Sequence, residues 1–288
     1  DHRDLHSFPT RRSSDLKGTS IKNILQLETT EKITSIISFK EFSEDHYLMM
    51  ATREGVVKKV SLSNFVNAKV RGIRALFLDE GDELLSCDLI QEGDEVMLIT
   101  KLGRGLRFRQ EDVRAMGRAS RGVRGIRLLG DDQVAGLLKV DNSKRILMIT
   151  ENGQGKQVTF DSFTVHGRGT QGQKIYRLGG KASFIVGVLS VDDDNDVVCV
   201  TLMGQTLRVH VNAISIQGRN AAGVKVVTMK FKGDSIVAIA STERDEEEEV
   251  EIPEQPAPES EEIIEDEGED EDIPVEDDEL VTEPSDND

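Results

Sequence analysis

Short apolar runs separated by tight-turn signals recur along the chain between residues 45 and 242. Each turn follows a β-prone run such as Val96-Met-Leu-Ile and precedes a second segment in which apolar and polar residues alternate. Glycine supplies the positive φ that a tight hairpin turn requires. The pattern therefore predicts four β-hairpins, with turns at Thr52–Gly55, Thr100–Gly103, Thr150–Gly153 and Thr201–Gly204.

Three further columns of residues repeat at the same interval. A glycine and a basic residue recur at spacings of 50, 50 and 51 residues, in Gly72-Ile73-Arg74, Gly122-Val123-Arg124, Gly172-Gln173-Lys174 and Gly223-Val224-Lys225. An apolar anchor precedes each of them, at Phe65, Val113, Phe163 and Ile214. A small residue marks the last apolar strand of each repeat, at Ser35, Ser86, Gly136, Gly187 and Ala238. Because this last column has five members, we expect the chain to begin inside a repeat.

These columns predict an all-β array of blades, each made of four short strands in about 50 residues. No proline occurs between Pro9 and Pro253, as expected where most backbone N–H groups serve sheets. We expect a β-blade domain over residues 17–242, divided into a partial repeat and four complete ones. The predicted bounds are 17–43 for the partial repeat, then 45–91, 94–140, 144–191 and 195–242.

Both ends of the chain differ from the repeats. Residues 1–16 show no periodicity, and we interpret them as a non-native adapter sequence or as a disordered leader. Residues 243–288 hold 25 acidic residues and one basic residue, a charge of −24, whereas residues 1–242 carry +6. Such a composition predicts a disordered tail because it cannot bury enough apolar surface to fold.

Several classes of protein are disfavoured by the residue inventory. Cys87 and Cys199 stand alone in apolar runs, which argues against a disulfide framework or a zinc site and favours a reducing cytosol. No apolar run approaches the roughly 20 residues of a membrane span. The five histidines form no metal-binding pair, and no nucleophile elbow or phosphate-binding loop is present. Asp192–Asp196 lacks the following glycine of a calcium loop and predicts a polar turn. We expect no catalytic residue, metal or cofactor in this chain.

The basic residues carry the stronger functional signal. In the second hairpin strands, alternation places Arg107, Arg109 and Arg208 on the face opposite the apolar residues. Lys58, Lys59 and Lys156 occupy matching places, and the Gly-x-Arg/Lys column adds one cation to every repeat. Evenly spaced cations on a rigid array fit a polyanion, and duplex DNA is the obvious one. The alternative is that these are ordinary solvated strand faces. Aromatic residues make up only 4% and do not alternate with the cations, so contacts to phosphates, independent of sequence, are expected.

Five further segments are informative: Asp94-Glu-Val-Met-Leu98, Val113-Arg-Ala-Met-Gly117, Gly122-Val-Arg-Gly-Ile-Arg127, Glu151-Asn-Gly-Gln-Gly-Lys156 and Ile214-Ser-Ile-Gln-Gly-Arg-Asn220. They resemble the C-terminal domain of the A subunit of bacterial DNA gyrase. The resemblance covers residues 17–242 and extends to the acidic tail. It implies a β-pinwheel of six Greek-key blades that bends and wraps DNA around a basic rim.

The resemblance also implies a larger assembly. Its partners would be duplex DNA, the remainder of the gyrase A subunit, and the gyrase B subunit in an A2B2 holoenzyme, which introduces negative supercoils. ATP and Mg²⁺ would be bound by the other domains, in the bacterial cytoplasm beside the nucleoid. The family's basic rim positions assign DNA contacts to Lys58, Lys59, Arg71, Arg74, Arg107, Arg109, Arg121, Arg124, Arg127, Lys156, Lys174, Arg177, Arg208, Arg219 and Lys225.

Two departures from the family pattern leave alternatives open. The glycine-rich basic heptad of the family's first blade, Gln-Arg-Arg-Gly-Gly-Lys-Gly, has no copy here. The family's cleavage domain with its nucleophilic tyrosine is also absent from this sequence, and we expect Tyr47 and Tyr176 to be core residues of blade strands. We therefore expect the chain to bind and bend DNA weakly and to supercoil nothing by itself. The related subunit of topoisomerase IV is one alternative. A protein-binding propeller of the kelch or WD40 kind is another, although the sequence holds no tryptophan. The tail is either a solubilising extension or a competitor of DNA for the basic rim.

Overall fold

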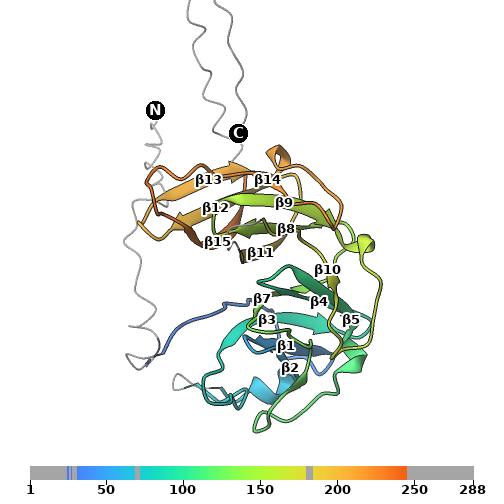
Figure 1. The fold of residues 1–288 in the computed structure, drawn as a ribbon. Coiled ribbons are helices and arrows are strands. Elements are labelled where there is room, and N and C mark those ends of the chain that lie inside the picture. The colour runs from blue at the N-terminus through green and yellow to red at the C-terminus, as the bar shows by residue number, and fades with distance from the viewer. Residues whose placement is uncertain (1–24, 26, 28–30, 69–71, 180–183, 245–288) are drawn as a thin grey trace, which may run out of the picture. The chain divides into compact units, whose positions relative to one another are not determined.

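The computed structural model describes residues 25, 27, 31–68, 72–179 and 184–244. The leader of residues 1–16, Arg71 and almost all of the acidic tail lie outside these residues. Within the described part, no helix is long and apolar enough to cross a membrane. The regular elements are β-strands and short 3-10 helices (Figure 1).

The four predicted hairpins are confirmed. They consist of β1 (His46–Thr52) and β2 (Val56–Ser61), β4 (Glu95–Thr100) and β5 (Arg104–Arg109), β8 (Arg145–Thr150) and β9 (Gln154–Thr159), and β12 (Asn195–Thr201) and β13 (Thr206–His210). In every turn the threonine Oγ1 accepts a hydrogen bond of 3.1 to 3.2 Å from the N–H four residues later. The turn glycines have φ between +79° and +81°, a conformation that a residue with a Cβ rarely adopts. The sequence signal and the observed turn therefore have the same physical cause.

A strand from the end of each repeat pairs with the first strand of its hairpin. These strands are β3 (Leu84–Gln91), β7 (Val134–Lys139), β11 (Ile185–Val191) and β15 (Ile236–Glu243). A 3-10 helix follows each hairpin, at η2 (Leu62–Phe65), η3 (Gln110–Asp112), η4 (Phe160–Ser162) and η5 (Val211–Ala213). The predicted anchor residues lie at the ends of these helices.

Three of the Gly-x-Arg/Lys segments form outer strands, and each of them joins the sheet of the preceding repeat rather than the sheet of its own repeat. They contribute β6 (Val123–Arg124), β10 (Gln173–Lys174) and β14 (Val224–Lys225), each paired with the second hairpin strand of the preceding repeat. The resulting sheets have the orders β3-β1-β2-β6, β7-β4-β5-β10 and β11-β8-β9-β14. We call each eight-residue segment that begins with this glycine a strap, at residues 72–79, 122–129, 172–179 and 223–230.

The predicted all-β blade array is confirmed, with two differences from the expected repeats. The fourth sheet, β15-β12-β13, contains three strands among the described residues. In the partial repeat, residues 31–43 contain no strand, so the strand expected around Ser35 is wrong. The first difference has a structural reason: a blade is completed by a strap from the next repeat rather than by its own, and no such strap pairs with β13 among the described residues. We number the sheets blades 1 to 4.

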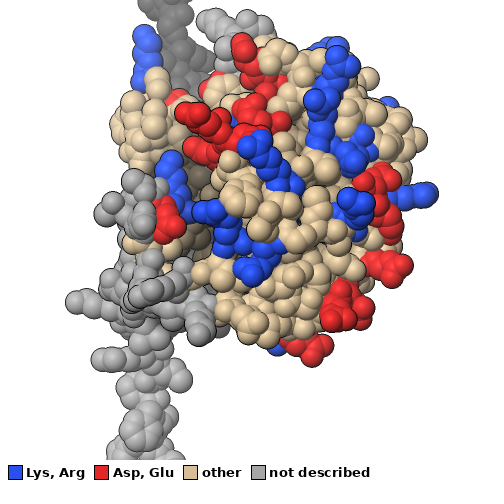
Figure 2. Space-filling view, turned by 90° about the horizontal axis from the view of Figure 1, so that it is seen from below, with Lys and Arg blue, Asp and Glu red and all other residues tan. Residues whose placement is uncertain are grey.

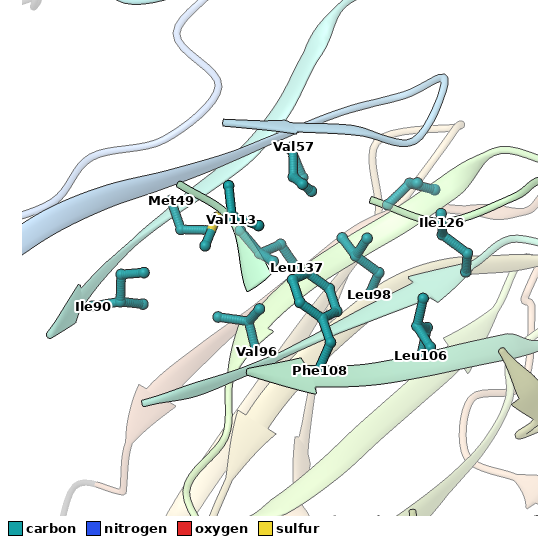
Figure 3. Packing of buried hydrophobic residues seen from close by; sticks show 12 residues of the cluster. Met49, Val57, Ile90, Val96, Leu98, Leu106, Phe108, Val113, Ile126 and Leu137 are labelled. Carbon is teal, nitrogen blue, oxygen red and sulfur yellow. The ribbon is translucent and has the colours of Figure 1, made fainter. Parts of the chain in front are cut away.

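The hydrophobic core lies between neighbouring blades. One cluster joins Met49 and Val57 of blade 1 to Leu98 and Phe108 of blade 2 (Figure 3). Two similar clusters join blade 2 to blade 3 and blade 3 to blade 4. Each middle blade is therefore buried on both faces, which explains why its central strands read as continuous apolar runs.

The small residues of the last strands let these blades approach one another. A Cβ placed on Gly187 of β11 would overlap Ile239 of β15. The column that marked the repeat in the sequence is thus a packing requirement between adjacent blades.

Candidate nucleic-acid interface

Three straps dock on their blades in one common geometry. Arg124, Lys174 and Lys225 each lie opposite the residue that follows the turn glycine of the preceding repeat. The carbonyl of that turn glycine accepts two N–H groups of the strap. For Gly103 the donors are Ile175 at 2.9 Å and Tyr176 at 3.3 Å. The repeat of these bonds on blades 1 and 3 fixes one basic residue at the same place on each of three neighbouring blades.

These strap cations are exposed, and further cations lie near them. Arg127 and Arg177 follow three residues later, and their N–H groups donate to Thr170 at 2.8 Å and Ala221 at 3.1 Å in the next repeat. The predicted site residues that are exposed are Arg74, Arg109, Arg121, Arg124, Arg127, Lys174, Arg177, Arg208 and Lys225. On the face drawn in Figure 2, lysine and arginine side chains gather across the middle, with most acidic side chains around them.

The predicted exposure of Lys58 and Lys156 is wrong, because both side chains are fully buried. Lys58 Nζ donates to the carbonyls of Ala75 at 2.8 Å, Arg118 at 2.6 Å and Ser120 at 2.8 Å. Three acceptors satisfy all three N–H bonds of an ammonium group. Lys58 therefore holds the segment of the next repeat that contains Arg118 and Ser120 against blade 1, and it has no N–H left for a phosphate.

Lys156 makes the same tie on blade 3. Its Nζ donates to the carbonyls of Gly218 at 2.9 Å, Arg219 at 2.8 Å and Ala221 at 3.0 Å. It also lies 4.9 Å from the centre of the Tyr176 ring. Burial lowers the pKa of Lys156 to about 8, because removal from water penalises the charged form.

Lys59 and Arg107 are also held inside the array, so their predicted placement at an open rim is wrong. Lys59 is 6% exposed, and its Nζ donates to the carbonyl and the side-chain oxygen of Gln110. Arg107 pairs with Glu95 at 2.6 Å and donates to the Phe160 carbonyl at 2.7 Å. Its side chain is 10% exposed. Each residue connects its blade to the first residue of the 3-10 helix of the next repeat, Gln110 in η3 or Phe160 in η4.

The reason for these corrections lies in the connection between repeats. Alternation in a strand predicts a solvent-facing side only when one face of the sheet is covered. Here the segment of the next repeat that lies between its 3-10 helix and its strap covers that side as well. The carbonyls of Lys59, Arg107 and Gln157 accept N–H groups of that chain, from Met116, His166 and Gln217, each at 2.9 Å.

Other predicted site residues have partners but remain at the surface. Arg121 pairs with Asp79 at 2.6 Å, and both side chains are more than half exposed. Arg219 is half-buried and donates to the side-chain oxygen of Gln173 at 2.5 Å.

Arg208 lies at 2.5 Å from Asp196, which is fully buried. Burial acts to raise the pKa of Asp196, but hydrogen bonds from His210 and Arg208 outweigh it and lower that pKa.

Sequence reasoning missed a column of arginines four residues before the strap glycines, at Arg118, Arg168 and Arg219. Arg168 donates to the carbonyls of Asp112 at 2.7 Å and Arg124 at 3.1 Å. It therefore braces the strap that carries Arg124. The signal was present as a third repeated basic position, but only Arg219 was assigned.

Arg104 was also missed, and it holds a strap directly. Its Nε donates to the carbonyl of Gln171 at 2.8 Å and its Nη2 to that of Gly172 at 3.0 Å. A pocket of about 530 Å³ opens beside it, with Lys174 and Arg177 in its lining. Arg104, Lys174 and Arg177 outnumber the one acidic residue of this lining, Asp132, so the hollow has a positive balance that suits an anionic group such as a phosphate.

Comparison with known proteins places this geometry in a family. Residues 46–91, 94–141, 144–192 and 195–243 match the family model described as DNA gyrase C-terminal domain, beta-propeller. The DNA gyrase A subunit of Treponema pallidum (strain Nichols) is 58% identical over 224 residues, which cover 78% of this chain and 27% of that protein. The chain thus spans about a quarter of the length of the curated relatives it matches.

Two solved structures share the fold. A structure of a DNA gyrase A C-terminal domain is 25% identical with a TM-score of 0.69, covering 80% of this chain and 77% of that one. A C-terminal domain of DNA topoisomerase IV is 23% identical with a TM-score of 0.73, covering 78% of this chain and 71% of that one. The second likeness is one of fold alone.

Proposed function

Because the chain belongs to the DNA gyrase C-terminal β-propeller family, we propose that it binds duplex DNA without sequence preference along its strap cations. The observation that carries this proposal is the exposed basic residue fixed at one equivalent place on each of three neighbouring blades. Phosphates repeat along DNA at regular intervals, so a regular row of cations on a rigid support matches them.

The curved row would bend the bound duplex. Bending a 20 to 30 base-pair site costs on the order of 1–6 kcal/mol, which several phosphate contacts together can offset. Arg124, Lys174 and Lys225 make the first contacts in this proposal, and Arg127 and Arg177 extend them along each strap. Arg74, Arg109, Arg121, Arg208 and Arg219 are secondary candidates, whereas the buried Lys58, Lys59, Lys156 and Arg107 are left out.

In a complete gyrase, this domain would wrap DNA for negative supercoiling by an enzyme of A2B2 composition. ATP and Mg²⁺ would act in the other domains, in the bacterial cytoplasm beside the nucleoid. We retain residues 1–16 as a separate leader, 17–242 as the DNA-binding domain and 243–288 as an acidic tail. A topoisomerase IV subunit is the second candidate, supported by the shared fold. The presence or absence of the basic heptad in the complete gene would separate the two.

The proposal is tested by removing the strap cations together. We expect the triple variant Arg124→Ala, Lys174→Ala and Lys225→Ala to weaken binding to a random-sequence duplex at least tenfold at low salt. It should reduce the slope of log K against log salt by up to about 2.7, since each phosphate contact contributes about 0.9.

A matched control removes three cations that lie off the straps, through Lys139→Ala, Lys144→Ala and Lys232→Ala. This variant has the same net charge and should retain most of the affinity and of the salt slope. An equal loss in both variants would mean that only the net charge matters. Affinity that does not fall as salt rises would instead favour the protein-binding propeller.

A further inference from the structure

A strap is held by the repeat that follows it as well as by the blade on which it docks. The strap of residues 122–129 shows this in its backbone hydrogen bonds. The Gly169 N–H donates to the carbonyl of Gly125 at 2.6 Å, and the Arg127 N–H donates to the carbonyl of Thr170 at 2.8 Å. Two backbone bonds therefore connect a strap that completes blade 1 to the segment that leads into the next strap.

Arg168 adds two side-chain hydrogen bonds to this contact. Its Nε donates to the carbonyl of Asp112 at 2.7 Å, and its Nη1 donates to the carbonyl of Arg124 at 3.1 Å. Asp112 ends η3, which follows the hairpin of blade 2, whereas Arg124 lies in β6 on blade 1. A guanidinium group is planar and holds its donors at fixed angles. Arg168 therefore fixes the backbone of Arg124 relative to the neighbouring blade.

The same column of arginines makes a second contact of this kind one repeat further along the chain. Arg219 Nη1 donates to the side-chain oxygen of Gln173 at 2.5 Å, and Gln173 directly precedes Lys174 in its strap. The Arg177 N–H of that strap donates to the carbonyl of Ala221 at 3.1 Å. The link between a strap and an arginine of the following repeat is thus a repeated feature of the array.

The fixed backbone matters because the Arg124 side chain is exposed and must lose rotational freedom when it contacts a phosphate. A strap that could also shift would add the cost of ordering its backbone. Fixing the backbone before binding removes that part of the cost. Arg168 itself is half-buried, and two of its guanidinium nitrogens already donate to carbonyls, so it is less available to a phosphate than Arg124 is.

We propose that Arg168 is a positioning residue for DNA, which holds Arg124 where that side chain meets a phosphate. This inference rests on the proposed binding of duplex DNA by the strap cations. Three successive repeats then build one phosphate contact, because they supply the blade, the strap with its cation, and the arginine that braces the strap. Loss of this brace should leave the contacts of other straps unchanged, which separates its role from a general effect on the fold.

A double-mutant cycle on the complete chain tests this role. Arg168→Lys keeps the charge, but a lysine carries its donors on a single nitrogen and cannot reproduce the bonds from Nε and Nη1 together. The substitution is measured in the wild type and with Arg124→Ala, by fluorescence anisotropy with a random-sequence duplex at several salt concentrations. A second cycle pairs it with Lys225→Ala, whose strap docks on blade 3. Arg114→Lys, at an exposed arginine, is the matched control.

The expected result is a loss that depends on Arg124. In the wild type, Arg168→Lys should weaken binding at least about threefold and lower the slope of log K against log salt by up to about 0.9, although the net charge is unchanged. With Arg124→Ala it should have almost no further effect, because the cation that it positions is gone. With Lys225→Ala it should again weaken binding about threefold. Arg114→Lys should bind as the wild type does.

Two results overturn the positioning role and leave the proposed DNA binding intact, provided that Arg124→Ala itself weakens binding. One is that Arg168→Lys retains the affinity and the salt slope of the wild type. The other is an equal loss with and without Arg124, since Arg168 would then act through its own contact with DNA or through the fold. If Arg124→Ala changes neither affinity nor slope, the strap contact and its positioning both fail.

Discussion

A comparison of Gly153→Ala with Gly204→Ala isolates the contribution of a docked strap to stability. Both glycines occupy the same turn, with φ of +79° and +80°, so the conformational cost of a Cβ is equal in the two variants. That cost is roughly 1–2 kcal/mol. Among the described residues a strap lies against Gly153 but not against Gly204, and a new Cβ at Gly153 would overlap the carbonyl of Val227.

The extra cost at Gly153 follows from the contacts that a displaced strap loses. Val226 and Val227 donate to the Gly153 carbonyl at 2.9 and 3.0 Å, and each bond is worth about 0.5–1.5 kcal/mol. Val227 is 3% exposed, and burial of such a side chain contributes about 1.5–3 kcal/mol. Since a shifted strap keeps part of these contacts, we expect Gly153→Ala to cost about 2–4 kcal/mol more than Gly204→Ala.

Urea unfolding followed by circular dichroism measures both variants against the wild type. Equal destabilisation of the two variants, within about 0.5 kcal/mol, would refute the conclusion that the straps hold the array together. A larger loss for Gly204→Ala would refute it as well.

Further predictions concern two buried charged residues, Lys156 and Asp196, and one exposed cation, Lys225. Lys156→Met should lower the free energy of unfolding by about 2–4 kcal/mol, because three carbonyls lose a charged donor, whereas Lys225→Met at the surface should change it by less than about 0.5 kcal/mol. The pKa of Lys156, about 8 in the folded state against 10.5 ordinarily, means that the unfolded chain binds more protons between these values. Stability should therefore rise with pH from about 8 to 10.5 through this residue, and Lys156→Met should lose that rise in pH-dependent urea titrations; an unchanged rise would assign it elsewhere. The lowered pKa of Asp196 acts in the same direction at acid pH: its contribution is complete above the ordinary value of 3.8 and is lost as pH falls through the folded pKa. Asp196→Asn should therefore flatten the acid limb of the stability curve, and an unaltered limb would contradict the ion pairs with Arg208 and His210.

The hairpins and their period were predictable because their cause is local. A threonine that bonds the turn and a glycine at positive φ are properties of four or five consecutive residues, as in Thr100–Gly103. The exposed strap cations were predictable for a similar reason. Arg124, Lys174 and Lys225 lie in two-residue edge strands, where a charged side chain meets little but water.

The errors concern residues whose surroundings come from elsewhere in the chain. Lys58 and Lys156 lie in second hairpin strands, where the sequence alone predicts a solvent-facing lysine, yet their Nζ atoms meet carbonyls about 60 residues away. The assignment of each strap to its own repeat failed for the same reason. The Gly-x-Arg/Lys motif fits a strand equally well in either blade, and nothing within the motif specifies its partner.

The amino-acid sequence is thus sufficient to establish the repeat, the hairpin turns, the all-β class and the family. The exchange of straps and the burial of the lysine ties depend on how neighbouring repeats pack. Turn geometry and alternation are set by bonds between residues close in the chain. The exposure of a side chain is set by whichever segment covers it, and in this protein that segment comes from the next repeat.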